Sequence, residues 1–159
     1  MQAAPATIDV EALAARVGSE LACSGWIEVS QARIDAFAAA TGDRQWIHLD
    51  PERARRDSPW GTTIAHGYLT LSLLPALIES CLRVEGVAMA VNYGLDRLRF
   101  PAPVPAGGRI RARIALEAAT PVDGGVQAHW LATIELEGGE RPACVARMLA
   151  RYYRQSSNA

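Results

Sequence analysis

Hydrophobic residues follow two different spacings along the chain, helical in the first half and alternating in the second. Helical spacing appears in a short segment, 10–17, and again over 31–41, while 26–29 has the composition of a brief strand. From 67 to 82 the sequence is apolar on nearly every side, which is typical of a helix buried at the centre of a domain. Pro75 lacks the N–H that would bond the carbonyl four residues earlier, so this central helix is predicted to be kinked.

Capping residues mark the ends of the two helices that precede the central one. Ser30 is a candidate N-cap for the helix over 31–41, and Gly42 is its candidate C-cap. Asp50 followed by Pro51 begins a second, short and polar helix that runs through residue 56. Asp43 is therefore predicted to lie just beyond a helix end.

From residue 87 onward the pattern predicts β-strands separated by Pro and Gly turns, over 87–93, 98–100, 109–116, 126–137 and 143–153. Helices followed by a run of strands indicate an α+β domain, in which an antiparallel sheet must cover the apolar helix. A long central α-helix wrapped by such a sheet is the hot-dog fold. We expect one such domain over 1–159, with an N-terminal extension over 1–23 that contains the short helix and a flexible tail over 154–159.

Composition and charge narrow the classes of function. The 159 residues carry a net charge of -1 and are 50% hydrophobic, which suits one sizeable core and argues against a nucleic-acid partner. All 16 basic residues are arginine. The absence of lysine excludes Schiff-base chemistry and the lysine-dependent phosphate loop.

Cysteine usage and the N-terminus predict a cytoplasmic protein with no membrane segment. Cys23, Cys81 and Cys144 are widely spaced, and no CxxC or HExxH pattern offers a metal site. They are interpreted as small buried apolar residues in a reducing compartment. The first residues lack the charged and apolar parts of a signal peptide, and no apolar run reaches the roughly 18 residues of a membrane helix.

Residues 41–50 concentrate carboxylates and an imidazole between two predicted helix boundaries. Asp43 and His48 are five positions apart, so a bend between them would place both side chains around one water molecule. Spacing alone favours a simpler interpretation, in which Asp43 caps the local backbone and His48 is a buried turn residue.

Three motifs resemble the MaoC-like family of R-specific enoyl-CoA hydratases. Gly42-Asp43 followed by His48-Leu49-Asp50-Pro51 is similar to the family pattern, although Gln45-Trp46 stands where the family usually has Asn-Pro. The sequence at 64–69 resembles the His-Gly signature that begins the hot-dog helix, and 92–104 resembles the strand and Pro-Val turn of the active-site wall. The resemblance covers about residues 24–153 and is closest to the NodN-like branch.

The resemblance implies an enzyme, a lyase that adds water reversibly to trans-2-enoyl-CoA and gives (3R)-3-hydroxyacyl-CoA. Asp43 would act as base, His48 would orient the water and relay the proton, and the Gly67 backbone N–H would stabilise the thioester oxygen. No cofactor is expected beyond the coenzyme A thioester substrate, for which an acyl carrier protein thioester is the alternative. A homodimer is expected, because a lone hot-dog sheet has open edges.

Other residues are candidates for substrate binding, and each has a structural alternative. Ile64, Ala65, Tyr68 and Trp46 are candidates for the acyl pocket and equally for the core. For His66, support of the catalytic residues from behind or a core position is favoured over direct substrate contact, and Asn92 belongs to the third motif. Two alternating arginine sets could meet the phosphates of coenzyme A, although a solvated sheet face is favoured for both; they are Arg97 and Arg99, and Arg109, Arg111 and Arg113.

Two alternative functions remain open at this point. A hot-dog acyl-thioesterase would use the same substrates, but it would release free thiol. A non-catalytic acyl-thioester binding or signalling protein would keep the fold without turnover, and the Gln45-Trp46 departure is the feature that favours it. Fold alone does not decide between these functions.

Overall fold

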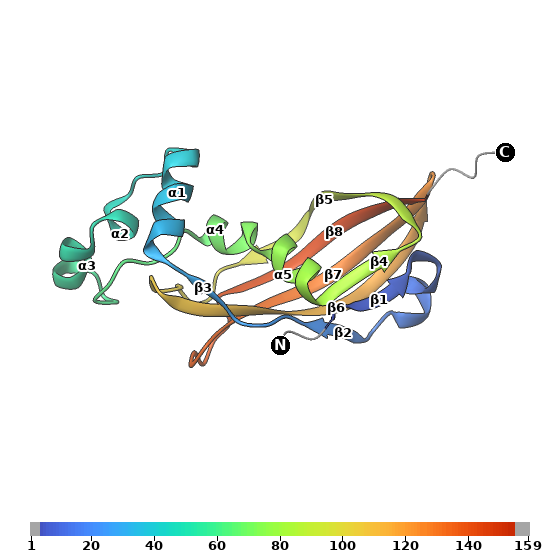
Figure 1. Cartoon of the computed structure of the whole chain (residues 1–159), viewed down its shortest axis with the longest axis horizontal. Helices are drawn as coiled ribbons and strands as arrows, with labels where there is room; N and C mark the ends of the chain where they lie inside the picture. Colours follow the sequence, from blue (N-terminus) through green and yellow to red (C-terminus); the bar gives the residue numbers. More distant parts are fainter. Residues whose placement is uncertain (1–3, 155–159) are drawn as a thin grey trace.

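The computed structural model describes residues 4–154, in which a curved antiparallel sheet covers helices on its inner side (Figure 1). The six strands lie in the order β2-β6-β7-β8-β5, and β3 also pairs with β6. All these pairs are antiparallel. The strands are β2 (Glu20–Cys23), β3 (Ile27–Val29), β5 (Val87–Arg99), β6 (Gly108–Val122), β7 (Gly125–Leu136) and β8 (Cys144–Arg154).

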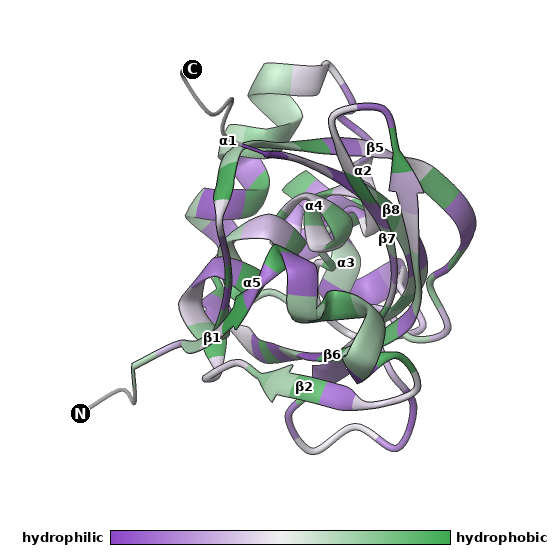
Figure 2. Cartoon of the chain, turned by 90° about the vertical axis from the view of Figure 1, so that its right-hand side faces the viewer, coloured by the Kyte–Doolittle hydropathy of each residue, from purple (hydrophilic) through white to green (hydrophobic). Residues whose placement is uncertain are grey.

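The central helix is divided into two segments, α4 (Gly67–Ser72) and α5 (Leu74–Cys81), which are joined through Leu73. Pro75 lies in the first turn of α5, where its missing N–H costs nothing, so the predicted kink is present and amounts to a break. Figure 2 shows the sheet curving around both helices. The α+β hot-dog architecture is confirmed, with two short helices in place of one continuous long one.

Alternation along the strands gives the sheet an apolar inner face. Residues at even positions of β6, β7 and β8 are buried against α4 and α5. Trp130 and Ile114 are among the largest fully buried side chains. The buried set on these strands comprises Ile110, Ala112, Ile114, Leu116, Val126, Ala128, Trp130, Ala132, Ile134, Cys144, Ala146, Met148, Ala150 and Tyr152.

The N-terminal residues take part in the same core. β1 (Ala6–Asp9) pairs in parallel with β4 (Leu82–Glu85), and the 3-10 helix η1 (Val10–Arg16) buries Leu13 completely. β2 then joins the main sheet through β6. The segment predicted as an N-terminal extension over 1–23 thus supplies two strands and a helix from residue 6 on. Of the predicted flexible tail, Arg154 ends β8 and 155–159 lie outside the described residues.

Three helices carry the chain from β3 to the central helix at one end of the sheet (Figure 1). α1 (Gln31–Thr41) begins after Ser30, whose side chain accepts a hydrogen bond from Arg33 N, and ends at Gly42 with φ of 81°. α2 (Trp46–Leu49), which the pattern did not predict, precedes α3 (Pro51–Asp57), and Asp50 caps α3 as expected. No helix within residues 4–154 is long and apolar enough to cross a membrane.

β5 is an edge strand of the sheet, hydrogen-bonded only to β8 among the described strands. It unites the two strands predicted at 87–93 and 98–100, and its register with β8 shifts at three places. These irregularities explain why alternation in the sequence appeared broken there. Large apolar side chains remain exposed along it, namely Met89, Val91, Tyr93 and Leu95.

Truncation at the centre of the sheet is expected to destabilise the fold strongly. Ile114 is fully buried, so Ile114→Ala should lower the free energy of unfolding by about 2–5 kcal/mol, because it removes contacts and leaves a cavity. Urea denaturation followed by circular dichroism measures this loss. Val17→Ala is the control, since Val17 is 44% exposed and its truncation should change stability by less than about 0.5 kcal/mol. Equal losses in the two variants would contradict the assigned core.

Candidate active site

Asp43 stands at the exposed end of α1, held by the turn that follows the helix. Gly42 closes the helix through its N–H, 2.9 Å from the Ala38 carbonyl, in a left-handed conformation that glycine adopts without strain. The Asp43 carboxylate then accepts a hydrogen bond from Gln45 N at 3.4 Å. With 55% of its side chain exposed, Asp43 remains accessible to water or a ligand.

His48 is buried in α2 and tied to the loop before α4. Its Nδ1 lies 2.6 Å from the Ile64 carbonyl, so Nδ1 carries the proton and Nε2 keeps a free lone pair. The Gln31 side chain donates to the His48 carbonyl at 2.8 Å and accepts from Thr63 Oγ1 at 2.5 Å. His48 is therefore held at its backbone carbonyl by α1 and at its imidazole by the Ile64 carbonyl.

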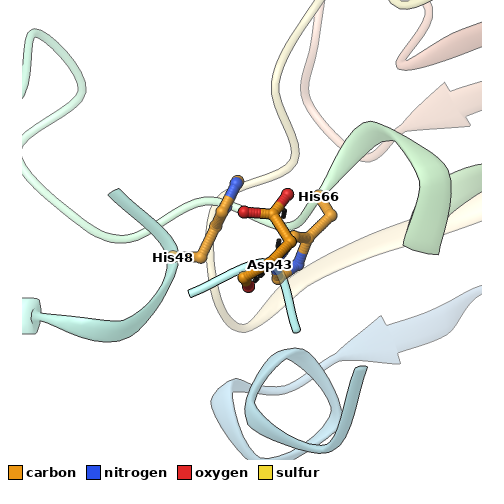
Figure 3. Close-up of side chains that lie close together, drawn as sticks. All are labelled: Asp43, His48 and His66. Carbon is orange, nitrogen blue, oxygen red and sulfur yellow. Dashed lines mark hydrogen bonds and ion pairs between the residues drawn. The ribbon is translucent and has the colours of Figure 1, made fainter. Parts of the chain in front are cut away.

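His66 contacts both Asp43 and His48. Its Nε2 lies 3.0 Å from the Asp43 backbone carbonyl and must donate to it, and its ring stacks on that of His48 with centroids 3.7 Å apart. The ring is 3% exposed, and its Nδ1 has no hydrogen-bond partner among the described residues. Figure 3 shows Asp43, His48 and His66 gathered in one group.

The electrostatic environment keeps His48 neutral. Burial lowers the pKa of His48 from its ordinary value, and the charge of a protonated His66 would lower it further. The hydrogen bond to the Ile64 carbonyl and the Asp43 carboxylate act in the opposite direction, but the net shift of the pKa is downward. His48 thus presents an accepting Nε2 under ordinary conditions.

His48 and Gly67 line one surface pocket of about 270 Å³. Gly67 opens α4, where the backbone N–H has no partner within the helix. A Cβ at this position would lie 2.8 Å from the Phe100 ring, so only glycine lets the helix start approach this wall. The lining comprises His48, Trp60, Ile64, Ala65, Gly67, Thr70, Phe100, Ala102, Pro103, Val104 and Ala143.

Several residues of this pocket were not singled out from the sequence. Trp60 is 45% exposed in the loop between α3 and α4, and Phe100 is 38% exposed after the end of β5. The sequence carried a signal for each, since Trp60 lies in a Ser-Pro-Trp-Gly turn and Phe100 precedes a proline. Aromatic residues that a turn leaves exposed beside a pocket are candidates for ligand contact.

Three of the predicted substrate-binding residues lie away from this pocket. Trp46 packs under the Arg53 guanidinium, 4.3 Å from its ring centroid. Tyr68 is 67% exposed and meets the edge of Phe100 with ring centroids 6.0 Å apart. Asn92 lines a second cavity. Ile64 and Ala65 line the pocket with His48, whereas His66 lies behind it.

The second cavity is mostly apolar and lies between the central helices and the strands β5 and β8. It measures about 270 Å³, and Pro75 at the start of α5 contributes to its wall. Asn92 offers the one carboxamide there. The remaining lining is Leu71, Ser72, Leu74, Gly94, Leu95, Met148 and Leu149.

Asp43, His48 and His66 are also the group best placed to hold a metal ion within residues 4–154, since their ligand atoms lie within 4.8 Å of one another. The geometry suits a metal poorly. One nitrogen of each ring already donates to a carbonyl, and the two remaining lone pairs lie in stacked planes that are inclined by 24°. Lone pairs in two nearly parallel planes do not converge well on one ion.

The same spacing suits a water molecule. A water needs partners about 2.7–3.0 Å away, so a separation within 4.8 Å between the Asp43 carboxylate and a His48 ring nitrogen leaves room for one bridging water. The Gly67 N–H lies at a helix N-terminus, where the peptide dipoles favour negative charge. His48 and Gly67 line one pocket, and the Asp43 carboxylate lies next to the His48 ring.

Comparison with known proteins identifies the family of the chain. The family model described as MaoC like domain matches residues 12–133. The chain is 50% identical over 141 residues to 3-hydroxyacyl-thioester dehydratase Z of Mycobacterium tuberculosis, covering 88% of this chain and 93% of that protein. It is 46% identical over 136 residues to nodulation protein N of Rhizobium leguminosarum bv. viciae, covering 84% of each.

Solved structures show the same fold. The (R)-hydratase from A. caviae involved in PHA biosynthesis superposes with a TM-score of 0.68 at 27% identity, covering 84% of this chain and 94% of that one. The family model spans most of the chain and the relatives align over nearly their whole length. The chain belongs to the MaoC-like dehydratase family.

Proposed function

We propose that the chain is an R-specific enoyl-CoA hydratase, which adds water reversibly to trans-2-enoyl-CoA and gives (3R)-3-hydroxyacyl-CoA. The observation that carries the proposal is that His48 and Gly67 line one pocket, while the Asp43 carboxylate lies within 4.8 Å of a His48 ring nitrogen. The names of the relatives, a 3-hydroxyacyl-thioester dehydratase and an (R)-hydratase, support the general reaction. No cofactor takes part in the proposed chemistry.

In the proposed mechanism Asp43 and His48 act together on the bridging water. Asp43 accepts one proton as the water oxygen bonds to C3, while His48 Nε2 accepts a hydrogen bond from the second hydrogen, which stays on the oxygen, and so orients the molecule. The double bond shifts, and negative charge develops on the thioester oxygen beside the Gly67 N–H. The proton then reaches C2 by relay through the pair, which leaves Asp43 ionised again.

The apolar cavity beside Asn92 is the proposed site for the acyl chain. It follows the same helix as Gly67, because Leu71 and Leu74 lie further along the α4–α5 path. Apolar walls favour a hydrocarbon chain over water. The carrier of the thioester is proposed to be coenzyme A, with acyl carrier protein as the alternative.

A homodimer and a cytoplasmic location complete the proposal. The exposed apolar side chains of the edge strand β5, among them Met89 and Tyr93, support pairing with a second copy. Cys23, Cys81 and Cys144 are free cysteines, which suits a reducing compartment. The prediction that all three are buried is wrong for Cys23, which is exposed, while Cys81 is half-buried and Cys144 is buried.

Loss of the carboxylate is expected to abolish most turnover. Asp43→Asn keeps the side-chain shape but cannot accept a proton, so kcat should fall by about 10²–10⁴-fold, and His48→Asn should act similarly. The assay follows the loss of enoyl absorbance with crotonyl-CoA and a longer enoyl-CoA, with chiral analysis of the product. Asp123→Asn is the control, because Asp123 is exposed in the turn between β6 and β7.

The same assay separates the rival functions. Release of free thiol by the wild-type protein would replace the proposal with a thioesterase. Binding of enoyl-CoA without loss of absorbance would replace it with a binding protein. Full activity of the Asp43→Asn variant would remove Asp43 from the mechanism.

His66 is expected to act as a positioning residue for the pair. His66→Phe keeps a ring against His48 but removes the donor to the Asp43 carbonyl, so kcat/KM should fall on the order of 10–100-fold. It also removes a charge that lowers the pKa of His48. The acid limb of the kcat/KM profile, which a lowered pKa places below about 6.5, should therefore move to higher pH.

The control for His66 is His129→Gln, because His129 lies in β7 outside the site. That variant should leave the acid limb in place. A His66→Phe variant with reduced activity but an unmoved acid limb would assign His66 a purely structural role.

A further inference from the structure

Three arginines gather around a pocket on the outer face of the sheet. Arg97 and Arg99 lie on β5 and Arg147 lies on β8, where the register places Arg97 opposite Arg147 and Arg99 opposite Val145. Together with Pro101, Leu131 and Val145 they line a depression of about 310 Å³. No acidic side chain is part of its lining. The pocket is therefore positively charged with an apolar floor.

Two of these guanidinium groups have no counter-charge within residues 4–154. Arg147 Nε lies 3.2 Å from the Glu117 carboxylate, but Arg97 and Arg99 form no ion pair with a described residue. The neighbouring Asp96 is directed elsewhere, with its carboxylate 3.7 Å from His129. The charge of Arg97 and Arg99 is thus available to a ligand.

The other arginine set on the outer face shows the contrast. Arg109, Arg111 and Arg113 alternate along β6 in the same way, but each is paired with a glutamate across the sheet. The distances are 3.0 Å to Glu137, 2.6 Å to Glu135 and 2.8 Å to Glu20. Neutralised arginines of this kind stabilise a solvated sheet face and leave little attraction for an anion. Of the two sets, that of Arg97 and Arg99 on β5 is the one without an ion pair among residues 4–154.

The arginine pocket shares a wall with the catalytic pocket. Arg99 and Pro101 line the first, whereas Phe100 between them lines the second and packs against Gly67. Figure 1 shows the end of β5 approaching the region of α4. A ligand that reaches both pockets needs only to pass around the end of this edge strand.

We propose that Arg97 and Arg99 bind the phosphate groups of the coenzyme A portion of the substrate, while Arg147, which is paired with Glu117, lines the same pocket. The inference rests on the proposed function and names the site of the carrier. Coenzyme A places a diphosphate and a 3′-phosphate at the far end of its pantetheine arm, so the phosphates must bind outside the catalytic pocket but near it. Guanidinium groups bind phosphate oxygens through paired, charge-assisted hydrogen bonds.

A carrier protein fits the pocket less well. Its phosphopantetheine arm has a single phosphodiester group, whereas Arg97 and Arg99 present two guanidinium groups without an ion-pair partner among the described residues, which match several phosphates close together. The apolar floor formed by Leu131 and Val145 offers a surface for the adenine ring.

The test compares substrates with and without the phosphates. In the double variant Arg97→Gln/Arg99→Gln, KM for enoyl-CoA should rise on the order of 10–100-fold while kcat stays within about twofold, because the lost bonds bind the carrier and not the reacting atoms. KM for the matching enoyl-pantetheine thioester, which lacks the diphosphate and the 3′-phosphate, should not change. The control Arg16→Gln/Arg141→Gln removes the same charge from exposed arginines elsewhere and should leave both KM values unchanged.

Calorimetric titration with coenzyme A alone tests the site independently of turnover. The double variant should bind coenzyme A more weakly by the same factor, and added salt should weaken the wild type more than the variant. This result would hold even if the wild-type protein catalysed no hydration, which separates failure of the inference from failure of the proposed function.

Three outcomes would overturn the inference. The first is an unchanged coenzyme A affinity in the double variant. The second is an equal rise in KM for the enoyl-pantetheine thioester, which would place the arginines in the catalytic pocket. The third is a loss confined to enoyl-acyl carrier protein, which would make the pocket a docking site for that protein.

Discussion

The structure depends on covering a short, apolar pair of helices with one curved sheet. Inner positions of β6, β7 and β8 alternate so regularly that nearly all are buried, and they pack on α4 and α5. This packing fixes the start of α4, since Gly67 lies too close to the Phe100 ring for any larger residue. The N–H groups at the start of α4 therefore lie at one end of the sheet. The turn that carries Asp43 and the short helix α2 that carries His48 lie at the same end.

The site combines rigidity on one side with access on the other. Both histidines are buried, and each is bonded to a backbone carbonyl of another segment, at 2.6 Å for His48 and 3.0 Å for His66. Asp43 meets them from an exposed helix end. Burial lowers the pKa of His48 and so favours its neutral form. The bond to a carbonyl also fixes one tautomer and one ring orientation, which a histidine in water does not have. Acid–base chemistry on a bound water requires polar groups in fixed orientations beside an accessible carboxylate. The two hydrogen-bonded imidazoles and Asp43 meet this requirement.

Local signals in the sequence predicted much of this, and tertiary contacts explain what they missed. Ser30, Gly42 and Asp50 cap the helices as expected, since capping depends on neighbouring residues alone. Pro75 likewise predicted the kink at which the central helix breaks, since the missing N–H of proline affects only the neighbouring turn. Stacking of His66 on His48 joins segments that only the folded chain brings together, so no spacing indicates it. Asn92 lies in another cavity because the bulged register of β5 decides which way each side chain points.

The two arginine sets show where prediction from alternation ends. Their spacing along the chain is the same, and a pattern of every second residue predicts only that each set shares one face of a strand. Whether the charges are neutralised depends on the partner strand. β6 lies inside the sheet, where Glu135 on β7, Glu137 just after β7 and Glu20 on β2 are its partners, whereas β5 is an edge strand with β8 as its one described neighbour. An edge position therefore leaves Arg97 and Arg99 with fewer cross-strand partners, and their charge stays available beside the wall of the pocket that His48 and Gly67 line.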